Sequence, residues 1–331
     1  MVLVVSYEED DHTAAVVARL RGDGRGVALL DTSRLGASDS LELEYRTGHA
    51  PAVRLHTPDG EFDLLAERAG WWRRLSGFAP DPAIDDPAAI GFVSSELGEV
   101  FEGAVGALDL DWINPPAADA RAHHKPLQWA LASQLGFDLS RTVVTRDPAR
   151  ARAFVDEVGL GRVVTKAFLA RTDAWRETHV LDADDLERLD QVRYAPTILQ
   201  EYVPGVDLRV TVVDGVAYAA EIDATGTSLP SDMRMVLDEA TVRAVELPAG
   251  VADLLGRLMR RLGLIYGAID LRRTPDGRYV FLEVNPAGLW LFAEERAGLP
   301  ITAAVADALA ARDGGRPRGV RAAADGGMVV A

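Results

Sequence analysis

The chain has 331 residues, 48% of them hydrophobic and 26% charged, with a net charge of −16 and no cysteine. This length predicts two or three domains with sizeable cores, and the acidic balance argues against nucleic acid or an anionic membrane as a partner. Lack of cysteine excludes disulfides and thiol nucleophiles. We expect a cytoplasmic location, because the first residues lack the order of a secretory signal and no apolar run approaches the roughly 20 residues that span a bilayer.

Residues 1–111 have the pattern of an N-terminal α/β domain. Three segments predict strand, helix and strand in turn: Val2 to Val5, the stretch after Asp11, and Val27 to Leu30. Alternating segments at 41–45 and 52–55 predict an added hairpin, and residues 87–108 have helical spacing. Two prolines after Asn114 mark the end of this block.

The second block, residues 112–196, holds the only two lysines among the 35 basic residues. Lys125 stands before Pro126 at the start of a helix that runs to Leu135, and a helix N-terminus favours phosphate. Lys166 ends a strand-like run, where a charge needs a partner. The adjacent His123 and His124 resemble a metal pair, but neighbours on a helix point in different directions.

The third block, residues 197–312, opens with a strand that ends at Gln200, Glu201 and Val203, turns at Pro-Gly, and resumes with Asp207 and Arg209 on one face. Backbone at the end of the first strand is suited to pair with an adenine edge. A carboxylate after the turn is suited to accept hydrogen bonds from ribose.

Two later strands, Tyr266 to Arg272 and Tyr279 to Pro286, are predicted to pair around the turn Thr274-Pro275-Asp276-Gly277. That pairing brings Asp270 near Glu283 and Asn285, which share a face because they are two residues apart. Three oxygen ligands without nitrogen or sulfur predict a Mg²⁺ site. A final helix is expected over Ala303 to Ala311, followed by a disordered tail over residues 313–331.

These motifs resemble those of the ATP-grasp ligases in order and spacing, over residues from about 112 to 311. The resemblance implies an ATP-grasp fold, in which two α+β subdomains clamp ATP behind an N-terminal α/β domain. It assigns Lys125 and Lys166 to phosphates, and Asp270, Glu283 and Asn285 to Mg²⁺. It assigns Gln200, Glu201 and Val203 to the adenine pocket and Asp207 to the ribose.

Further motifs resemble those of the graspetide synthetases, the microviridin-type peptide maturases. They are Trp71-Trp72-Arg73-Arg74, Asp111 to Pro116, Asp207 to Val213, Asp232-Met233-Arg234 and Glu283 to Phe292. Leu289 and Met233 depart from the residues common in that family, Gln and Trp, and both departures bear on the peptide substrate and the ring pattern.

The resemblance implies an ADP-forming ligase that joins a carboxylate to an alcohol or an amine. An Asp or Glu side chain of a ribosomal precursor peptide, with a leader and an acidic core containing Ser or Thr, is activated by ATP as an acyl phosphate. A Ser or Thr hydroxyl or a Lys amine then closes an ω-ester or ω-amide ring. Arg209 and Arg234 are the residues expected to hold the acyl phosphate, Arg73 and Arg74 are weaker candidates for the same cleft, and Asp232 is a candidate base.

Three other interpretations stay open at this point. In the first, the chain is a related ligase that adds free amino acids to a peptide or a small carboxylate and uses the same ATP residues. In the second, it is a non-catalytic nucleotide-binding module that regulates a partner, although retention of all three metal ligands argues against this. In the third, the segment after Lys166, with Trp175, is a flap that docks the peptide. A homodimer is an expectation from the resemblance alone.

Overall fold

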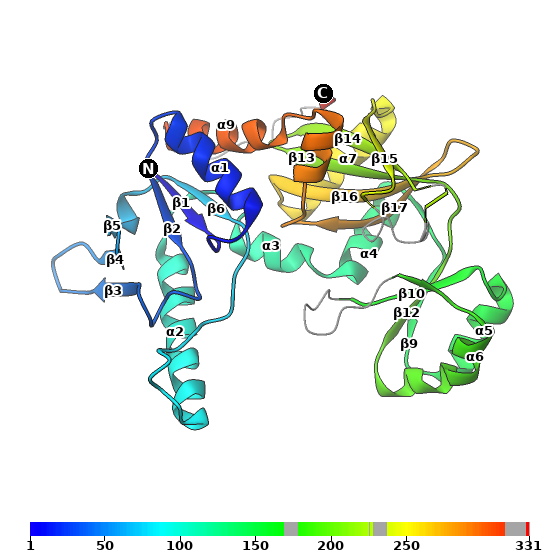
Figure 1. The fold of residues 1–331 in the computed structure, drawn as a ribbon, viewed down its shortest axis with the longest axis horizontal. Helices are drawn as coiled ribbons and strands as arrows, with labels where there is room; N and C mark the ends of the chain where they lie inside the picture. The colour runs from blue at the N-terminus through cyan, green and yellow to red at the C-terminus, as the bar shows by residue number, and fades with distance from the viewer. Residues whose placement is uncertain (169–177, 225, 228–236, 315–328, 331) are drawn as a thin grey trace.

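The computed structural model describes residues 1–168, 178–224, 226–227, 237–314 and 329–330. Four β-sheets organise this part of the chain, and helices cover them (Figure 1). Two of the sheets contain strands that are distant from one another in the sequence, so the sheets follow the order of the chain only in part.

The first sheet is parallel, with the strand order β2-β1-β6-β7. Its strands, in that order, are Val27–Leu30, Val2–Val5, Ala69–Trp72 and Asp111–Ile113. The side chains of β1 alternate between a core with α1 (Asp11–Gly22) and α9 (Ile301–Asp313) and a core with α2 (Pro87–Ala107). Because both faces are covered, the strand is apolar throughout. The predicted strand, helix and strand are confirmed.

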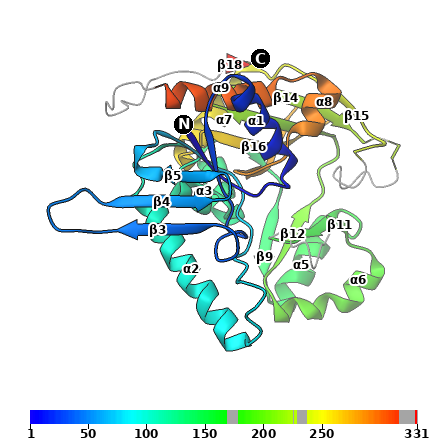
Figure 2. The ribbon, with the colours of Figure 1, turned by 60° about the vertical axis from the view of Figure 1, so that its left-hand side comes forward.

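A second, antiparallel sheet follows β2 and projects from the molecule (Figure 2). It comprises β3 (Ser40–Glu44), β4 (Ala52–Thr57) and β5 (Gly60–Asp63), with a 3₁₀ turn at Leu64–Ala66. The predicted hairpin is confirmed, and β5 adds a third strand to it.

The third sheet is small and antiparallel, with the order β11-β10-β12-β9. These strands are His179–Val180, Val163–Lys166, Thr197–Glu201 and Thr142–Thr145. Helices α5 (Pro148–Val158) and α6 (Ala183–Arg188) and the 3₁₀ segment Leu189–Tyr194 give it a core of its own.

The fourth sheet is the largest, with the order β15-β14-β13-β16-β17-β8 and β18 paired to β14. Its strands, in that order, are Thr241–Ala244, Val216–Asp223, Val206–Val213, Tyr266–Arg273, Tyr279–Asn285, Asp138–Leu139 and Val329–Val330. Helices α4 (Lys125–Leu135) and α7 (Ala249–Leu262) cover one face. Helices α8 (Leu291–Ala297) and α9 cover part of the other face, where the core is shared with the parallel sheet.

Alternation along β13 decides where a site can form. Leu208 and Val210 point into the core with α4 and α7. Asp207 and Arg209 point to the opposite face, as the period of two requires. The register sets Asp207 against Arg272 and Arg209 against Asp270 of β16. One end of this face is therefore polar, whereas its other end belongs to an apolar core.

The packing bears on the predicted domain limits at residues 111 and 196. Strand β7 continues past residue 111 and pairs with β6 in the parallel sheet. Helices α3 (Pro116–Ala122) and α4 pack with α7, and α4 contacts β17 of the large sheet. We therefore propose three domains with one changed limit: the central domain begins near Ser140 and not at the predicted residue 112.

The C-terminal prediction needs correction in its detail. Asp313, expected in a disordered tail, is the last residue of α9, because the helix continues past the predicted end at Ala311. Val329–Val330 form β18, since two apolar residues extend the edge of the large sheet. The rest of the predicted tail, and the predicted flap with Trp175, lie outside the described residues. Among the described helices, none combines the length and the apolar character needed to cross a bilayer.

Candidate active site

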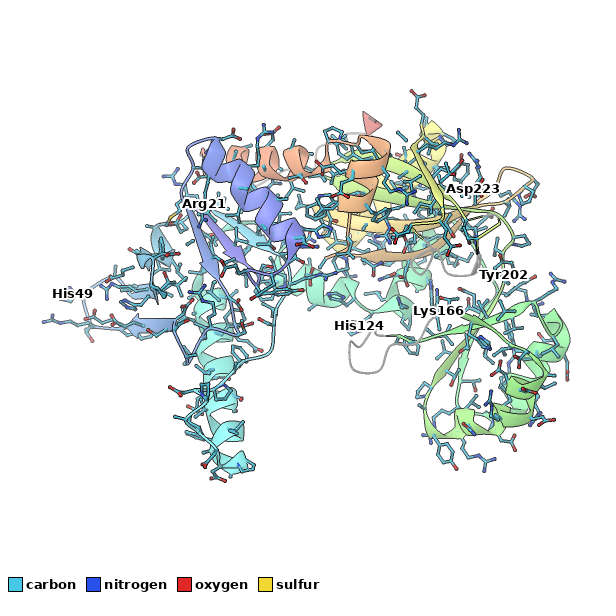
Figure 3. All side chains as sticks on the ribbon, in the orientation of Figure 1. Arg21, His49, His124, Lys166, Tyr202 and Asp223 are labelled. Atoms are coloured by element: carbon cyan, nitrogen blue, oxygen red, sulfur yellow. The ribbon has the colours of Figure 1, made fainter. Side chains whose placement is uncertain are left out.

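A pocket of about 840 Å³ lies where three of the sheets meet. The small sheet and the large sheet form two of its walls, and the ends of β1 and β6 form the third. Figure 3 shows Lys166 and Tyr202, two of the lining residues, in the region between the small sheet and the large sheet. Every predicted nucleotide and metal residue lines it, together with Arg209. They are Lys125, Lys166, Gln200, Glu201, Val203, Asp207, Asp270, Glu283 and Asn285.

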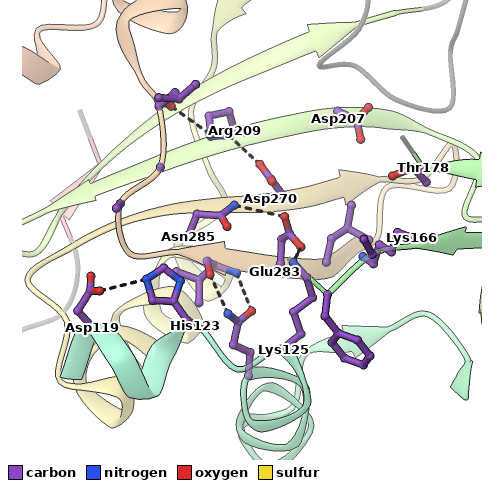
Figure 4. Close-up of a pocket in the computed structure, with 18 of the residues that line it drawn as sticks. Asp119, His123, Lys125, Lys166, Thr178, Asp207, Arg209, Asp270, Glu283 and Asn285 are labelled. Atoms are coloured by element: carbon purple, nitrogen blue, oxygen red, sulfur yellow. Dashed lines mark hydrogen bonds and ion pairs between the residues drawn. The ribbon is translucent and has the colours of Figure 1, made fainter. Parts of the chain in front are cut away.

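The three predicted metal ligands come together on the β16–β17 hairpin (Figure 4). The register sets Asp270 opposite Glu283 and Ala268 opposite Asn285, and it shifts between Asp270 and Leu271. The Nδ2 atom of Asn285 donates to Oε1 of Glu283 at 3.3 Å. The predicted pairing of these strands is confirmed, and it leaves three oxygen-bearing side chains on one face.

Helix α4 fixes the edge of β17 beside these ligands. The Gln128 amide donates to the carbonyl of Val284 at 2.8 Å and accepts from its N–H at 2.9 Å, as a neighbouring strand would. The Trp129 indole N–H donates to the carbonyl of Leu282 at 2.9 Å. Glu283, between these two contacts, is thereby aimed into the pocket. Gln128 was not predicted from the sequence, because its partner on β17, Val284, lies 156 residues away.

Both lysines act on Glu283. Lys125 begins α4, as predicted, and its ammonium pairs with the Glu283 carboxylate. Lys166 ends β10, and its ammonium lies 5.9 Å from the centre of the Trp129 ring. Burial raises the pKa of Glu283, but the charges of Lys125 and Lys166 outweigh this effect and lower that pKa to about 2. Glu283 is therefore a carboxylate at neutral pH.

Arg209 links the hairpin to the loop that follows it. Its Nε lies 2.7 Å from Oδ1 of Asp270, and its Nη1 donates to the carbonyl of Leu289 at 3.0 Å. Arg209 is buried. Arg234, its predicted companion, and Asp232 lie outside the described residues.

The predicted adenine segment makes several contacts within the protein. The Gln200 side chain donates to Thr142 at 2.8 Å, and the Glu201 carboxylate accepts from Arg162 at 2.9 Å. The Glu201 N–H donates to the Arg141 carbonyl at 2.8 Å, and the Glu201 carbonyl accepts from the Ser140 hydroxyl. Asp207, the predicted ribose acceptor, pairs with Arg272 at 3.2 Å.

The loop after Asn285 is held by residues from three parts of the chain: the segment that follows β6, strand β16 and helix α1. Arg73, only 2% exposed, donates to the carbonyl of Gly288 at 2.9 Å, and the Tyr266 hydroxyl donates to the same oxygen at 2.8 Å. Arg74 donates to the Ala287 carbonyl at 3.1 Å. His12 accepts from the Trp290 N–H at 2.9 Å. Arg73 and Arg74 face the pocket, as their sequence motif predicted, whereas His12 was not predicted.

The adjacent histidines do not form a pair. His123 lines the pocket, and its Nε2 lies 3.1 Å from Oδ1 of Asp119, one helical turn earlier. His124 is exposed and precedes the first residue of α4. The side chains thus diverge, as expected for neighbours in the chain.

Two sheets that enclose a pocket with two lysines and an Asp, Glu and Asn hairpin define an ATP-grasp protein. Solved structures agree. The macrocyclase MdnC of Microcystis aeruginosa MRC, bound with precursor peptide MdnA, is 27% identical, with a TM-score of 0.84 over 94% of this chain and 99% of that chain. The ATP-grasp ligase PsnB, complexed with minimal precursor, Mg and ADP, is 27% identical, with a TM-score of 0.72 over 95% of this chain and 98% of that chain.

A RiPP-associated ATP-grasp ligase of Chryseobacterium gregarium, in complex with ADP and a leader and core peptide, has a TM-score of 0.84 at 24% identity, over 97% of this chain and 99% of that chain. At this identity the likeness concerns the fold. No family model matches the chain, and no curated protein matches it by sequence. The structural similarities confirm the ATP-grasp fold and the resemblance to the graspetide synthetases that the motifs indicated.

Proposed function

We propose that this chain is an ATP-dependent peptide macrocyclase. It activates Asp or Glu side chains of a ribosomal precursor peptide and joins them to Ser or Thr hydroxyls or to Lys amines. The observation that carries this proposal is the convergence of Asp270, Glu283 and Asn285 with Lys125 and Lys166 in one pocket. The similar structures of MdnC and PsnB support it, since both hold precursor peptides.

The acidic hairpin fits Mg²⁺. Asp270, Glu283 and Asn285 offer oxygen atoms, which Mg²⁺ prefers, and few protein ligands leave room for phosphate oxygens. The low pKa of Glu283 keeps its carboxylate ionised and ready to bind a cation at neutral pH. Bound Mg²⁺ neutralises charge on the phosphates and so favours phosphoryl transfer.

The wall formed by the small sheet fits the nucleotide. We assign Lys125 and Lys166 to the phosphates, where ammonium groups act as point charges. Gln200, Glu201 and Val203 line the adenine end. Within the described residues the N–H of Val203 makes no hydrogen bond, so we assign it as the backbone donor to adenine. Asp207 takes the ribose, alongside its contact with Arg272.

The reaction then needs two transfers. A substrate carboxylate attacks the γ-phosphate of ATP, which gives an acyl phosphate and ADP, and a hydroxyl or amine of the same peptide displaces phosphate from the acyl carbon. Arg209, fixed between Asp270 and Leu289, is suited to hold the acyl phosphate, and Arg234 is its proposed companion. The chain has no cysteine, and the route needs no covalent enzyme intermediate.

The end of the pocket near the parallel sheet is assigned to the peptide. Tyr7, Arg74 and Leu75 line it, after the ends of β1 and β6. Ligands of α/β sheets bind beyond the carboxyl ends of the strands, and Arg74 supplies a positive charge for an acidic core.

The test is the intact mass of a small acidic peptide, chosen from those encoded beside this gene, after incubation with the enzyme, Mg²⁺ and ATP. Loss of whole water masses with the unaltered enzyme, and not with Asn285→Ala, is the expected result. A mass gain equal to an added residue contradicts macrocyclisation and indicates a ligase for free amino acids. Absence of ADP release with the peptide present indicates a non-catalytic module.

A further inference from the structure

The buried carboxylate of Asp119 contacts His123 at the edge of the pocket. The Asp119 side chain is only 6% exposed, whereas that of His123 is 50% exposed and lies on the pocket wall. Oδ1 of Asp119 contacts His123 Nε2 at 3.1 Å, and Oδ2 is buried without a hydrogen-bond partner among the described residues. Burying a carboxylate is costly unless it is paired. The contact between the buried Asp119 carboxylate and the half-exposed His123 side chain therefore suggests a functional role for the two residues.

The hydrogen bond fixes the proton of the imidazole. A carboxylate only accepts, so the neutral ring carries its proton on Nε2, next to Asp119. Nδ1 then keeps a lone pair and is the basic atom. A histidine oriented by a carboxylate in this way is the arrangement that general bases use.

The other acids of the pocket are engaged with cations. Four acidic residues besides Asp119 line it in the described part of the chain, and each has a cationic partner: Glu201 with Arg162, Asp207 with Arg272, Asp270 with Arg209, and Glu283 with Lys125. A carboxylate that pairs with a cation is a weak base. Among the described lining residues, His123 is therefore the side chain best suited to accept a proton.

The position of His123 suits the second transfer. In Figure 4 His123 lies on the opposite side of Glu283 from Lys166, which ends β10 next to the predicted nucleotide strand. Its neighbours in the pocket wall include Pro116 and Ala120 of α3. The dyad thus borders the hairpin at the end away from the small sheet, toward the part of the pocket assigned to the peptide.

We propose that His123, oriented by Asp119, is the general base for ring closure, an inference that rests on the proposed function. Nδ1 takes the proton from a Ser or Thr hydroxyl of the peptide while its oxygen bonds to the acyl carbon. The bond between that carbon and the phosphate oxygen breaks, phosphate leaves with the electron pair, and the proton passes from His123 to phosphate. His123 takes no part in the formation of the acyl phosphate.

The experiment separates the two transfers in one peptide, with the neighbouring acidic peptide, Mg²⁺ and ATP as reactants. Ring closure is followed as loss of water mass. Acyl phosphate is followed as the hydroxamate that forms when hydroxylamine is added, because this strong nucleophile needs no general base. The variant His123→Gln keeps an N–H for Asp119 and removes the basic atom. His124→Gln, which alters the exposed neighbour, is the matched control.

We expect His123→Gln to lower the rate of ring closure about 100-fold or more, the scale of general-base catalysis, with hydroxamate formation unchanged. Asp119→Asn should lower ring closure about tenfold or more, again without loss of hydroxamate, as expected for a positioning residue. His124→Gln should leave both products unchanged.

Two results overturn the inference. Unchanged ring closure in His123→Gln would show that His123 is not the general base. Equal loss of both products would show that His123 acts in carboxylate activation or in the architecture of the pocket. If the unaltered enzyme gives neither product, the proposed function itself fails, and the inference fails with it.

Discussion

Arg209 and Arg272 each sit opposite an acid in the register of β13 and β16. Arg209 faces Asp270, and Asp207 faces Arg272. Removing one partner of a buried ion pair leaves an uncompensated charge, which costs about 3–5 kcal/mol. Asp207 and Asp270 therefore each lie beside a cation of the protein before any ligand binds.

His12 is a buried residue with a pH-dependent effect on stability. Burial lowers its pKa, Arg73 lowers it further, and the pKa falls to about 4. In the folded protein the neutral ring accepts hydrogen bonds from the N–H groups of Trp290 and Leu291. An unfolded chain binds a proton at this histidine near pH 6.5, so between pH 6.5 and 4 the unfolded state holds more protons.

Stability must therefore fall as the pH falls through this range. We expect the His12 contribution to lower the free energy of unfolding by about 2 kcal/mol between pH 8 and pH 5. Urea unfolding at several pH values measures it, and His12→Asn should be less stable at pH 8 with a flatter pH dependence. His49→Asn, at an exposed turn, should keep the slope of the unaltered protein. The same slope in His12→Asn would contradict the assignment.

Some of these residues could be predicted from sequence and others could not. Asp270, Glu283 and Asn285 follow from a hairpin turn and a period of two, which are local patterns. Gln128 and His12 act on partners 156 and 278 residues away. No local pattern encodes such a contact, because it depends on how helices pack on distant strands.

At the scale of elements, α4 both supplies a charged residue of the pocket and holds strand β17 in place. Lys125, Gln128 and Trp129 share one face of the helix by their spacing, and all three contact β17. The predicted helix at Lys125 is confirmed, but its docking on β17 was not predicted. The helix therefore sets both the charge beside Glu283 and the direction of that side chain.

Gln128→Leu tests this docking. The substitution keeps a similar volume but leaves the N–H of Val284 and the carbonyls of Val284 and Ala122 without this partner. Buried groups left without hydrogen bonds cost about 1–3 kcal/mol each, so we expect a loss of about 2–4 kcal/mol in urea unfolding and slower ADP release. Gln134→Leu, on the exposed side of the same helix, should change neither quantity appreciably.

The loop after Asn285 has a second constraint at Gly288. A Cβ atom there would lie 2.3 Å from Cβ of Ala268 and 3.2 Å from Cβ of Asn285. The loop must shift in Gly288→Ala, and we expect at least a tenfold loss in the rate of ADP release, because small displacements at a reacting centre cost orders of magnitude. Gly103→Ala, in open space on α2, is the matched control. Full activity in Gly288→Ala would show that the loop does not position Asn285.

At the scale of the whole molecule, the sheets are joined unequally. The parallel sheet and the large sheet share one hydrophobic core, whereas the small sheet has its own. The pocket is where the small sheet faces the other two. A ligand that contacts both walls therefore connects the small sheet to the other two sheets, with which it shares no hydrophobic core.

Binding of Mg·ADP should accordingly stabilise the folded protein. A ligand at 100 times its dissociation constant adds about 2.7 kcal/mol, which for a chain of this length raises the midpoint of thermal unfolding by about 4 °C. Chelation of Mg²⁺ should remove much of this shift, and so should Asp270→Asn, since Asp270 is a proposed metal ligand. Asp276→Asn, at the exposed turn of the same hairpin, should keep the full shift. An equal shift with and without Mg²⁺ would contradict the metal assignment of the hairpin and leave the nucleotide assignment intact.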